Sequence, residues 1–349
     1  MNIYIAINNP YKNQNPFVRT LIDGIKHLHP DAHIAYGLEL LWREECLNYD
    51  IIHIQWPEVF AFNATYLNNL ADRLVFLKNK GKIIISTCHN INCHFRRKAN
   101  RDAAYPIVYG ISDYMIHLGN YSLELMKNLY PNAKHVLIPH HVYDHIYKLP
   151  LPKKDCANIL KINSKKNYIL CLGDFRNKKE RELVIKMSYM LPPNYSVLAP
   201  SFSKIQKRRN LFYLIKPLCI YLYYKLKYPK IKNLGRFVTD EEIPQLFGVA
   251  DFCFIQRING INSGNVPMSF LMGKVVVGPS IGNIKEILEE TGNPIFDPYV
   301  EESIRIAIQK GIYLSSQNKG FNNREYALHQ LSTYTICEKI YKLYQKAIQ

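Results

Sequence analysis

Several features are scarce or missing in this sequence. No run of roughly 18 or more uncharged apolar residues occurs, so no segment of it is long enough to span a bilayer unaided. The first ten residues, MNIYIAINNP, have neither the basic start nor the apolar stretch of a signal peptide, and we expect no secretion. Acidic residues number 28 against 45 Lys and Arg, which gives a formal net charge of +17. That charge predicts an anionic partner, whether nucleic acid, lipid headgroups or phosphorylated substrates.

The eight cysteines show no paired spacing typical of a disulfide framework. Cys171 lies in the apolar run YILCLG, which is typical of a reduced, buried thiol in a cytoplasmic protein. In TCHNINCH, Cys88 and Cys93 stand beside His89 and His94, so a zinc site has to be considered. No second ligand pair with finger-like spacing follows, and we therefore expect no metal.

Two successive series of short β-rich runs alternate with helical stretches. Such alternation predicts α/β domains with parallel, doubly wound sheets, and 349 residues fit two of them. We expect a first domain over 1–145, a polar linker over 146–166 and a second domain over 167–330. A terminal helix within 331–349 has an apolar face and is expected to pack on a domain, with a return to the first domain as one option.

The segment 202–234 differs from its surroundings. It holds nine basic residues and no acid, with aromatic and aliphatic residues between them. Each Lys or Arg near an anionic leaflet contributes about 1 kcal/mol, so we favour contact with an anionic membrane surface. The alternatives are a solvated basic helix pair packed on its own domain and binding of single-stranded nucleic acid. No nucleic-acid module motif supports the last alternative, and we expect no nucleic-acid partner.

Polar and aromatic side chains follow the predicted strands of the first domain. Ligands of open α/β sheets bind beyond the carboxyl ends of the strands, and those positions hold imidazoles, amides, an indole and a carboxylate in NNPYKNQNPF, HIQWPE and STCHNINCH. Aromatic rings stack on sugar C–H faces while the polar groups bond to hydroxyls, so this set suits a sugar. The candidates for acceptor binding are Asn9, Phe17, His53, Trp56, Asn90, His94 and His140.

The same strand ends carry two candidate catalytic bases. His89 ranks first and Glu58 second, because a neutral imidazole or a carboxylate can accept a hydroxyl proton within hydrogen-bond reach. For each residue singly, a structural role is an equally open alternative.

In the second domain, LGDFRNKKE places cations directly after a strand and at a helix start. A diphosphate would meet Arg176, Lys179 and free backbone amides there, although helix starts usually favour acids. Further on, the loop INSGN could cradle phosphate or ribose oxygens with the amides of Ser263, Gly264 and Asn265. The sequence therefore predicts a nucleotide-diphosphate site in this domain.

Taken in order, these motifs resemble the retaining glycosyltransferases of the B fold, GT-B, especially the bacterial exopolysaccharide and capsule enzymes. The resemblance covers almost the whole chain and rests on DIIHIQWPE and STCHNINCH in the first half, and on LGDFRNKK, GRFVTDEEIPQLFGVADFCFI and GKVVVGPSIGNIKEIL in the second. It implies two Rossmann-like domains facing a central cleft, with a UDP- or GDP-linked sugar on the second. The implied donor-binding residues are Gly173, Arg176, Lys179, Phe237, Val238, Asn262, Ser263, Gly264, Asn265 and Glu286.

The implied reaction moves a hexosyl unit to a glycan or lipid-linked acceptor in capsule, exopolysaccharide or lipopolysaccharide assembly, at the inner face of the cytoplasmic membrane. It implies neither a cofactor nor a metal, since cations and a helix dipole meet the leaving charge. A retaining course would use the leaving diphosphate to help deprotonate the acceptor, whereas an inverting one would need a base.

The sequence departs from the family at a pair of glutamates around the INSGNVPMS loop. The corresponding positions lie close to Ile261 and Ser269, so Asn262, Ser263 and loop amides are expected to contact ribose and donor sugar instead. Two alternatives stay open. The missing glutamates leave a catalytically degenerate GT-B protein that binds polysaccharide or acts as a scaffold. The shared two-domain plan leaves a nucleotide-sugar epimerase.

Overall fold

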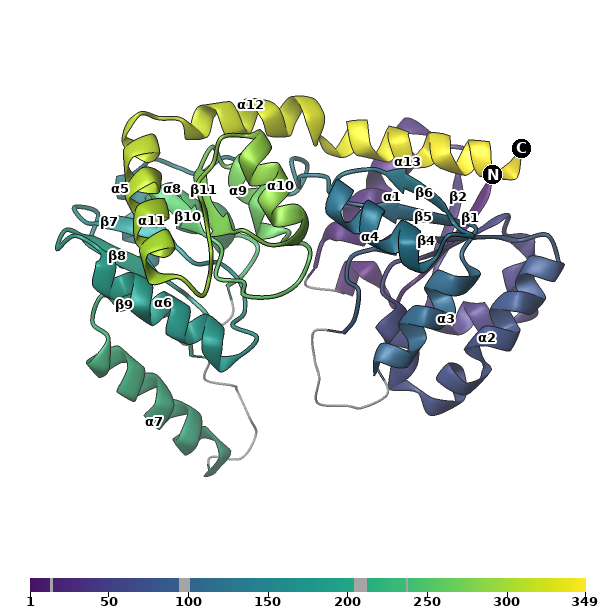
Figure 1. The fold of residues 1–349 in the computed structure, drawn as a ribbon, viewed down its shortest axis with the longest axis horizontal. Coiled ribbons are helices and arrows are strands. Elements are labelled where there is room, and N and C mark those ends of the chain that lie inside the picture. The colour runs from purple at the N-terminus through teal and green to yellow at the C-terminus, as the bar shows by residue number, and fades with distance from the viewer. Residues whose placement is uncertain (13–14, 94–100, 204–211, 237) are drawn as a thin grey trace. The chain divides into compact units, whose positions relative to one another are not determined.

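The computed structural model describes residues 1–12, 15–93, 101–203, 212–236 and 238–349. The chain forms two compact units, and each combines segments that are distant in sequence (Figure 1). Unit 1 contains Met1–Tyr143, Gly260–Asn262 and His329–Gln349, and unit 2 contains Asp144–Asn259 and Ser263–Leu328.

Unit 1 is built on a six-stranded sheet in which every neighbouring pair is parallel. The strand order is β2-β1-β3-β4-β5-β6. The strands are β1 Asn2–Ala6, β2 His33–Tyr36, β3 Ile51–Ile54, β4 Ile83–Cys88, β5 Tyr114–His117 and β6 Lys134–Leu137. The central strands β3 and β5 are buried along their whole length, as expected for a sheet with helices on both faces.

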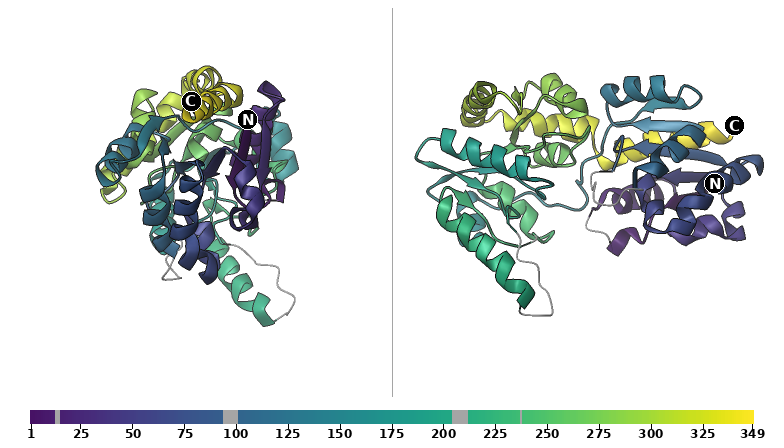
Figure 2. Two further views of the ribbon diagram at one scale, coloured as in Figure 1. Left: turned by 90° about the vertical axis from the view of Figure 1, so that its right-hand side faces the viewer. Right: turned by 60° about the horizontal axis from the view of Figure 1, so that its bottom comes forward.

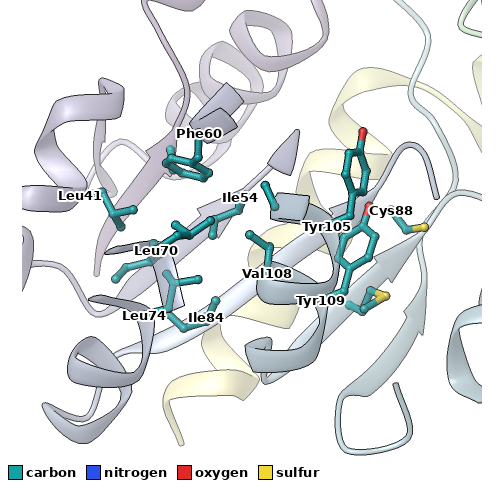
Figure 3. Packing of buried hydrophobic residues seen from close by; sticks show 14 of the residues in the cluster. Leu41, Ile54, Phe60, Leu70, Leu74, Ile84, Cys88, Tyr105, Val108 and Tyr109 are labelled. Atoms are coloured by element: carbon teal, nitrogen blue, oxygen red, sulfur yellow. The ribbon is translucent and has the colours of Figure 1, made fainter. Parts of the chain in front are cut away.

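Helices of unit 1 cover both faces of this sheet. They are α1 Phe17–Leu28, α2 Ala64–Asn79, α3 Ala104–Ile111, α4 Asn120–Leu129 and α13 Thr333–Ile348. Short 3-10 turns lie at Pro10–Lys12, Leu38–Trp42, Glu44–Asn48, Pro57–Phe62 and Arg101–Ala103. Between the sheet and the helices α2 and α3 lies a continuous hydrophobic core that includes Ile54, Phe60, Leu70, Ile84 and Val108 (Figure 3).

The chain returns to unit 1 in its last helix. α13, yellow in Figure 1, runs beside α1, and the hydroxyl of Thr333 donates to the carbonyl of Val142 at 2.9 Å. The two helices meet closely, because a Cβ added to Gly24 would lie 2.5 Å from the sulfur of Cys337. Glycine at position 24 therefore allows α13 to pack on α1.

Unit 2 repeats the plan with a second six-stranded parallel sheet, in the order β12-β11-β10-β7-β8-β9. Its strands are β7 Asn167–Leu170, β8 Tyr195–Leu198, β9 Ile231–Lys232, β10 Phe252–Phe254, β11 Val275–Pro279 and β12 Ile295–Phe296. The predicted α/β class with two doubly wound parallel sheets is thus confirmed.

The helices of unit 2 are α5 Lys153–Leu160, α6 Lys178–Met190, α7 Phe212–Lys227, α8 Glu242–Val249, α9 Asn265–Leu271, α10 Gly282–Glu290, α11 Glu301–Ser316 and α12 Gly320–Gln330. The stretch 146–166, predicted as a linker, holds α5 and belongs to unit 2. Cys156, Ala157 and Leu160 are buried on one face of α5, which packs against α8. Those three apolar positions are too few to reveal a helical period among prolines and lysines.

Helix α7 projects from the β9 edge of unit 2 in all three views (Figures 1 and 2). It covers the second half of the basic segment 202–234, and residues 204–211 of that segment lie outside the described part. None of the helices described, α7 included, is both long and apolar enough to cross a membrane.

The contact between α1 and α13 gives a stability prediction. Gly24→Ala should lower the free energy of unfolding by about 1–3 kcal/mol, because its methyl group would overlap the buried Cys337 sulfur. Gly110→Ala is the matched control at an exposed position of α3, where nothing lies within 4 Å of an added Cβ, and it should stabilise by about 0.5–1 kcal/mol. Urea unfolding measures both, and equal signs for the two variants would contradict the packing described.

Candidate functional site

The strand order of each sheet marks where a ligand would bind. In unit 2 the chain runs from β7 outward to β8 and β9, then restarts at β10 on the other side of β7. In unit 1 the corresponding reversal lies between β1 and β3. Open α/β sheets bind ligands at such switch points, beyond the carboxyl ends of the two strands. The candidates for a ligand site are therefore the residues that follow β7, β10, β1 and β3.

In unit 2, the backbone after β7 passes very close to the start of α9. Gly173 has a φ of 88°, in the left-handed region that favours glycine. A Cβ at this position would lie 3.2 Å from Nδ2 of Asn265 and 3.5 Å from Nη2 of Arg257. The Asn265 amide donates to the carbonyl of Leu172 at 2.7 Å. Glycine at 173 thus brings the loop after β7 against the residues that follow β10.

A buried carboxylate organises the cations at this switch point. Glu180, on the first turn of α6, has no exposed surface. Its Oε2 accepts hydrogen bonds from the backbone N–H of Arg176 at 2.7 Å and from Nη1 of Arg257 at 2.9 Å. Arg257 also donates to the carbonyl of Asp174 at 2.8 Å. These bonds hold Arg257 and the Asp174–Arg176 backbone together.

Two guanidinium groups lie near each other here. Burial, together with the positive charge of Arg257, lowers the pKa of Arg176 to about 10. At neutral pH Arg176 therefore keeps its charge. Two neighbouring, partly desolvated cations favour an anionic ligand, and planar guanidinium groups suit phosphate oxygens.

The other predicted donor-binding residues lie at varied places. Lys179 is exposed on the first turn of α6, while Val238, Ser263 and Gly264 are half-buried in loops and Glu286 is half-buried on α10. Phe237 lies outside the described residues.

Asn262 was predicted to bind the donor together with residues of unit 2, but it belongs to unit 1. Its Nδ2 donates to the carbonyls of His89, at 2.9 Å, and Cys88, at 3.4 Å, both at the end of β4. Asn262 lies three positions before α9, and its bond to the end of β4 could not be predicted from local sequence.

In unit 1, aromatic rings cluster beyond the ends of β3 and β4. Phe17 opens α1 and meets the ring of His89 edge-on at 4.7 Å between centroids, with His140 at 4.8 Å and His141 at 4.4 Å. Trp56 stacks on His89 at 4.6 Å. Phe17, Trp56, His89 and His140 are among the residues predicted from the sequence, whereas His141 is not.

A chain of polar contacts runs from α13 to His89. Oε1 of Gln55 lies 2.9 Å from Nε2 of His89, and Nε2 of Gln55 lies 3.1 Å from Nε2 of His53. Nδ1 of His53 lies 2.6 Å from the Tyr344 hydroxyl, and its Nε2 lies 2.8 Å from Oγ1 of Thr87.

With the Gln55 amide in this orientation, the tautomer of His89 is defined. An amide oxygen can only accept, so Nε2 of His89 carries the proton and Nδ1 keeps its lone pair. Nδ1 has no hydrogen-bond partner among the residues described. His89 therefore presents an acceptor nitrogen. The chain of contacts through Gln55, His53 and Tyr344 holds its ring in this orientation.

His53 itself is not at the rim, where the sequence predicted it. It lies within β3, has no exposed surface and bonds to Tyr344 and Thr87. Side chains of a strand alternate between faces, and His53 faces α13 while Ile52 and Ile54 face the core. His53 therefore lies within the sheet, beneath the cluster of aromatic rings, and is not part of that cluster.

Burial keeps these imidazoles neutral. It lowers the pKa of His53 to about 3 and that of His140 to about 4, and it holds the pKa values of His89 and His141 well below the usual range. Elsewhere in unit 1, burial and the neighbouring His135 lower the pKa of His117 to about 3. Neutral imidazoles can accept protons from hydroxyls but cannot attract phosphate.

The remaining candidates of unit 1 lie around this cluster. Glu58 accepts a hydrogen bond from the Tyr105 hydroxyl at 2.6 Å, and burial raises its pKa. Asn9 is exposed and its Oδ1 accepts from the backbone of Tyr11, whereas Asn90 is buried. His94 lies outside the described residues, and no three metal-ligating side chains gather within the described part of the chain.

No family model matches the sequence, and no curated protein matches it significantly. Solved structures do match in fold. A sucrose-phosphate synthase from Thermosynechococcus elongatus is 14% identical with a TM-score of 0.74, over 99% of this chain and 98% of that one. Anabaena HepE in complex with UDP-glucose is 14% identical with a TM-score of 0.72, over 99% and 100%.

A third similar structure is WaaG, a glycosyltransferase involved in lipopolysaccharide biosynthesis, at 11% identity with a TM-score of 0.63, over 98% of this chain and 99% of that one. At these identities the likeness shows a shared fold. Because it spans nearly the full length of both chains in each case, the pairing of two α/β units is common to all of them.

The buried histidines predict acid sensitivity. Each is neutral in the folded chain and protonates in the unfolded chain below about pH 6.5, so stability is lost as the pH falls from there toward the folded pKa values near 3–4. His117→Asn should reduce the slope of unfolding free energy between pH 6 and 5 by about 1 kcal/mol per pH unit. His33→Asn, at an exposed position on β2, should leave the slope unchanged. Urea unfolding at several pH values tests this, and equal slopes for both variants would contradict it.

The Glu180–Arg257 pair predicts a large effect of removing one partner. Arg257→Leu should destabilise unit 2 by about 3–5 kcal/mol, because it leaves a buried carboxylate unpaired. Adding Glu180→Gln should recover part of that loss in a double-mutant cycle. Lys178→Ala breaks the exposed pair with Glu182 and should cost less than about 1 kcal/mol. An Arg257→Leu loss no larger than that of Lys178→Ala would refute the account.

Proposed function

We propose that this chain, which has the fold of the GT-B glycosyltransferases, moves a hexosyl unit from a UDP- or GDP-linked sugar onto a glycan or lipid-linked acceptor. The observation that carries the proposal is the cation pair of Arg176 and Arg257 at the switch point of unit 2, held by buried Glu180. Similar structures contain UDP and UDP-glucose, which supports the donor class.

The donor diphosphate would lie against this pair. Breaking the bond between sugar and phosphate leaves negative charge on the diphosphate, and preorganised cations stabilise that charge more in the transition state than in the ground state. Lys179 adds a third cation from α6, and the amides of Ser263 and Gly264 are the proposed contacts to ribose or phosphate oxygens. Because these cations meet the charge directly, we expect transfer without a metal or a cofactor.

The acceptor would bind to the cluster of unit 1. The Trp56 and Phe17 rings offer faces for sugar C–H groups, and Nδ1 of His89 can take a hydrogen bond from the attacking hydroxyl. In the retaining course that we favour, the new C–O bond forms on the face from which the diphosphate leaves. The single proton of the hydroxyl then passes to a departing phosphate oxygen, whereas in an inverting course Nδ1 of His89 would accept that proton instead.

The pathway proposed is capsule, exopolysaccharide or lipopolysaccharide assembly on the cytoplasmic side of the membrane. Support comes from the likeness in fold to WaaG and from the net charge of +17, which favours anionic surfaces. A degenerate scaffold protein or a nucleotide-sugar epimerase would share the donor site. The requirement for an acceptor separates these three activities.

The test is thermal unfolding of the protein with UDP, GDP, CDP, ADP and their sugars, with and without EDTA. A ligand at 100 times its Kd should stabilise by about 2.7 kcal/mol, and Arg176→Ala should abolish the shift. Lys178→Ala, two residues further on at the exposed start of α6, should keep it. A shift with one nucleotide, followed by release of that nucleotide only when acceptor is added, supports transfer.

Other outcomes would contradict the proposal. No shift with any nucleotide, or an equal shift in Arg176→Ala, would remove the donor site. Binding without turnover would favour the scaffold, and conversion of the sugar without acceptor would favour the epimerase.

A further inference from the structure

Tyrosines anchor helix α7 on unit 2. Tyr221 and Tyr224 of α7, and Tyr228 directly after its end, follow one another at helical spacing and are half-buried. Tyr224 meets the buried ring of Phe202 edge-on at 5.2 Å, and a Cβ added to Gly235 would lie 2.8 Å from the ring of Tyr221. These tyrosines explain how α7 is anchored.

The opposite side of α7 is also apolar, and it is exposed. Ile215, Leu218, Leu222 and Leu226 follow one another at intervals of three and four residues, and at about 100° per residue they lie within one narrow arc. We call these four residues the outer stripe. All four are exposed, and Leu226 reaches 80%. A solvated helix carries charged residues on this side, so the outer stripe requires a partner.

Charge around the outer stripe favours one kind of partner. Lys225 and Lys227 are exposed. At about 100° per residue Lys225 lies next to the stripe, and Lys227 lies beyond Tyr223, to whose hydroxyl its amine donates at 2.6 Å. The segment 202–234 holds nine basic residues and no acid. An apolar stripe with lysines near it matches an anionic bilayer surface, where the stems of the lysines reach up to the phosphates. At 16 residues α7 is shorter than a bilayer span, which favours a helix lying in the plane of the interface.

We propose that α7 lies flat on an anionic lipid surface, with the outer stripe at the boundary of headgroups and acyl chains and its lysines on lipid phosphates. The proposal deepens the proposed function, on which it rests for its purpose, by naming the element that brings the chain to a lipid-linked acceptor. Lipid binding itself requires no sugar transfer, so the two can fail separately.

The first experiment is flotation of the full chain with vesicles of phosphatidylglycerol and phosphatidylcholine at low salt. Leu222→Gln/Leu226→Gln should weaken binding at least about a hundredfold, because two leucine side chains no longer leave water for the acyl-chain boundary. Lys225→Gln/Lys227→Gln should weaken it roughly tenfold on the anionic vesicles. Ile306→Gln is the matched control, an aliphatic residue 56% exposed on α11 of the same unit, and it should leave binding unchanged.

Cys219 makes a second, direct readout possible. It is the only exposed cysteine of the eight, all of which lie in the described part of the chain, and it borders the outer stripe one residue after Leu218. A thiol-reactive, polarity-sensitive dye at Cys219 should shift its emission to the blue on phosphatidylglycerol vesicles. The same dye on Cys219→Ser/Ile306→Cys should not shift.

Several outcomes would overturn the proposal. They are vesicle binding that the outer-stripe variant does not weaken, binding without an emission shift at Cys219, no binding to anionic vesicles, binding of single-stranded RNA in place of vesicles, and self-association that the outer-stripe variant abolishes. If the nucleotide shift persists in any of these cases, only the lipid surface fails. A lost nucleotide shift with intact vesicle binding would instead remove the proposed function and leave α7 as a lipid-binding element.

Discussion

Glu180 has its carboxylate buried beside two guanidinium groups, and the proposed donor site in unit 2 depends on that arrangement. Taking a carboxylate out of water costs several kcal/mol unless cations and hydrogen-bond donors surround it. Here Arg257 and the backbone of Arg176 supply them. The same bonds draw the loop after β7 and the residue after β10 together across the switch point, although 77 residues separate Glu180 and Arg257 in sequence. A structural ion pair thereby brings a second guanidinium group to the place where a diphosphate would bind.

The electrostatic condition in unit 1 is the opposite one, because its buried imidazoles are neutral where unit 2 has cations. Under the proposed function its cluster needs an uncharged His89, because a protonated imidazole has no lone pair to accept a hydrogen bond from a hydroxyl. Burial supplies that condition by lowering the pKa values of His53, His89 and His140. Burial also requires hydrogen-bond partners, which Gln55 provides for His89 and Tyr344 provides for His53. The last helix of the chain is therefore part of the support beneath the site, which gives its return to unit 1 a chemical consequence.

Local sequence patterns predicted most of the fold, and particular residues show what such patterns cannot predict. Strand and helix periods sufficed for the two sheets, and the rule that ligands follow strands led to Arg176, Phe17, Trp56 and His89. Arg257 follows a strand as well, but only the adjacency of β7 and β10 brings it to Glu180, and that adjacency is a property of strand order.

His53 and Tyr344 show the same limit of prediction from sequence in unit 1. A strand end misjudged by one or two residues moves a side chain from the rim into the sheet, as happened with His53. Tyr344 lies on the apolar face of α13, where nothing in the sequence separates a packing tyrosine from one whose hydroxyl bonds to a buried histidine. Polar contacts between elements distant in sequence thus decide both sites, and hydrophobic periodicity carries no information about them.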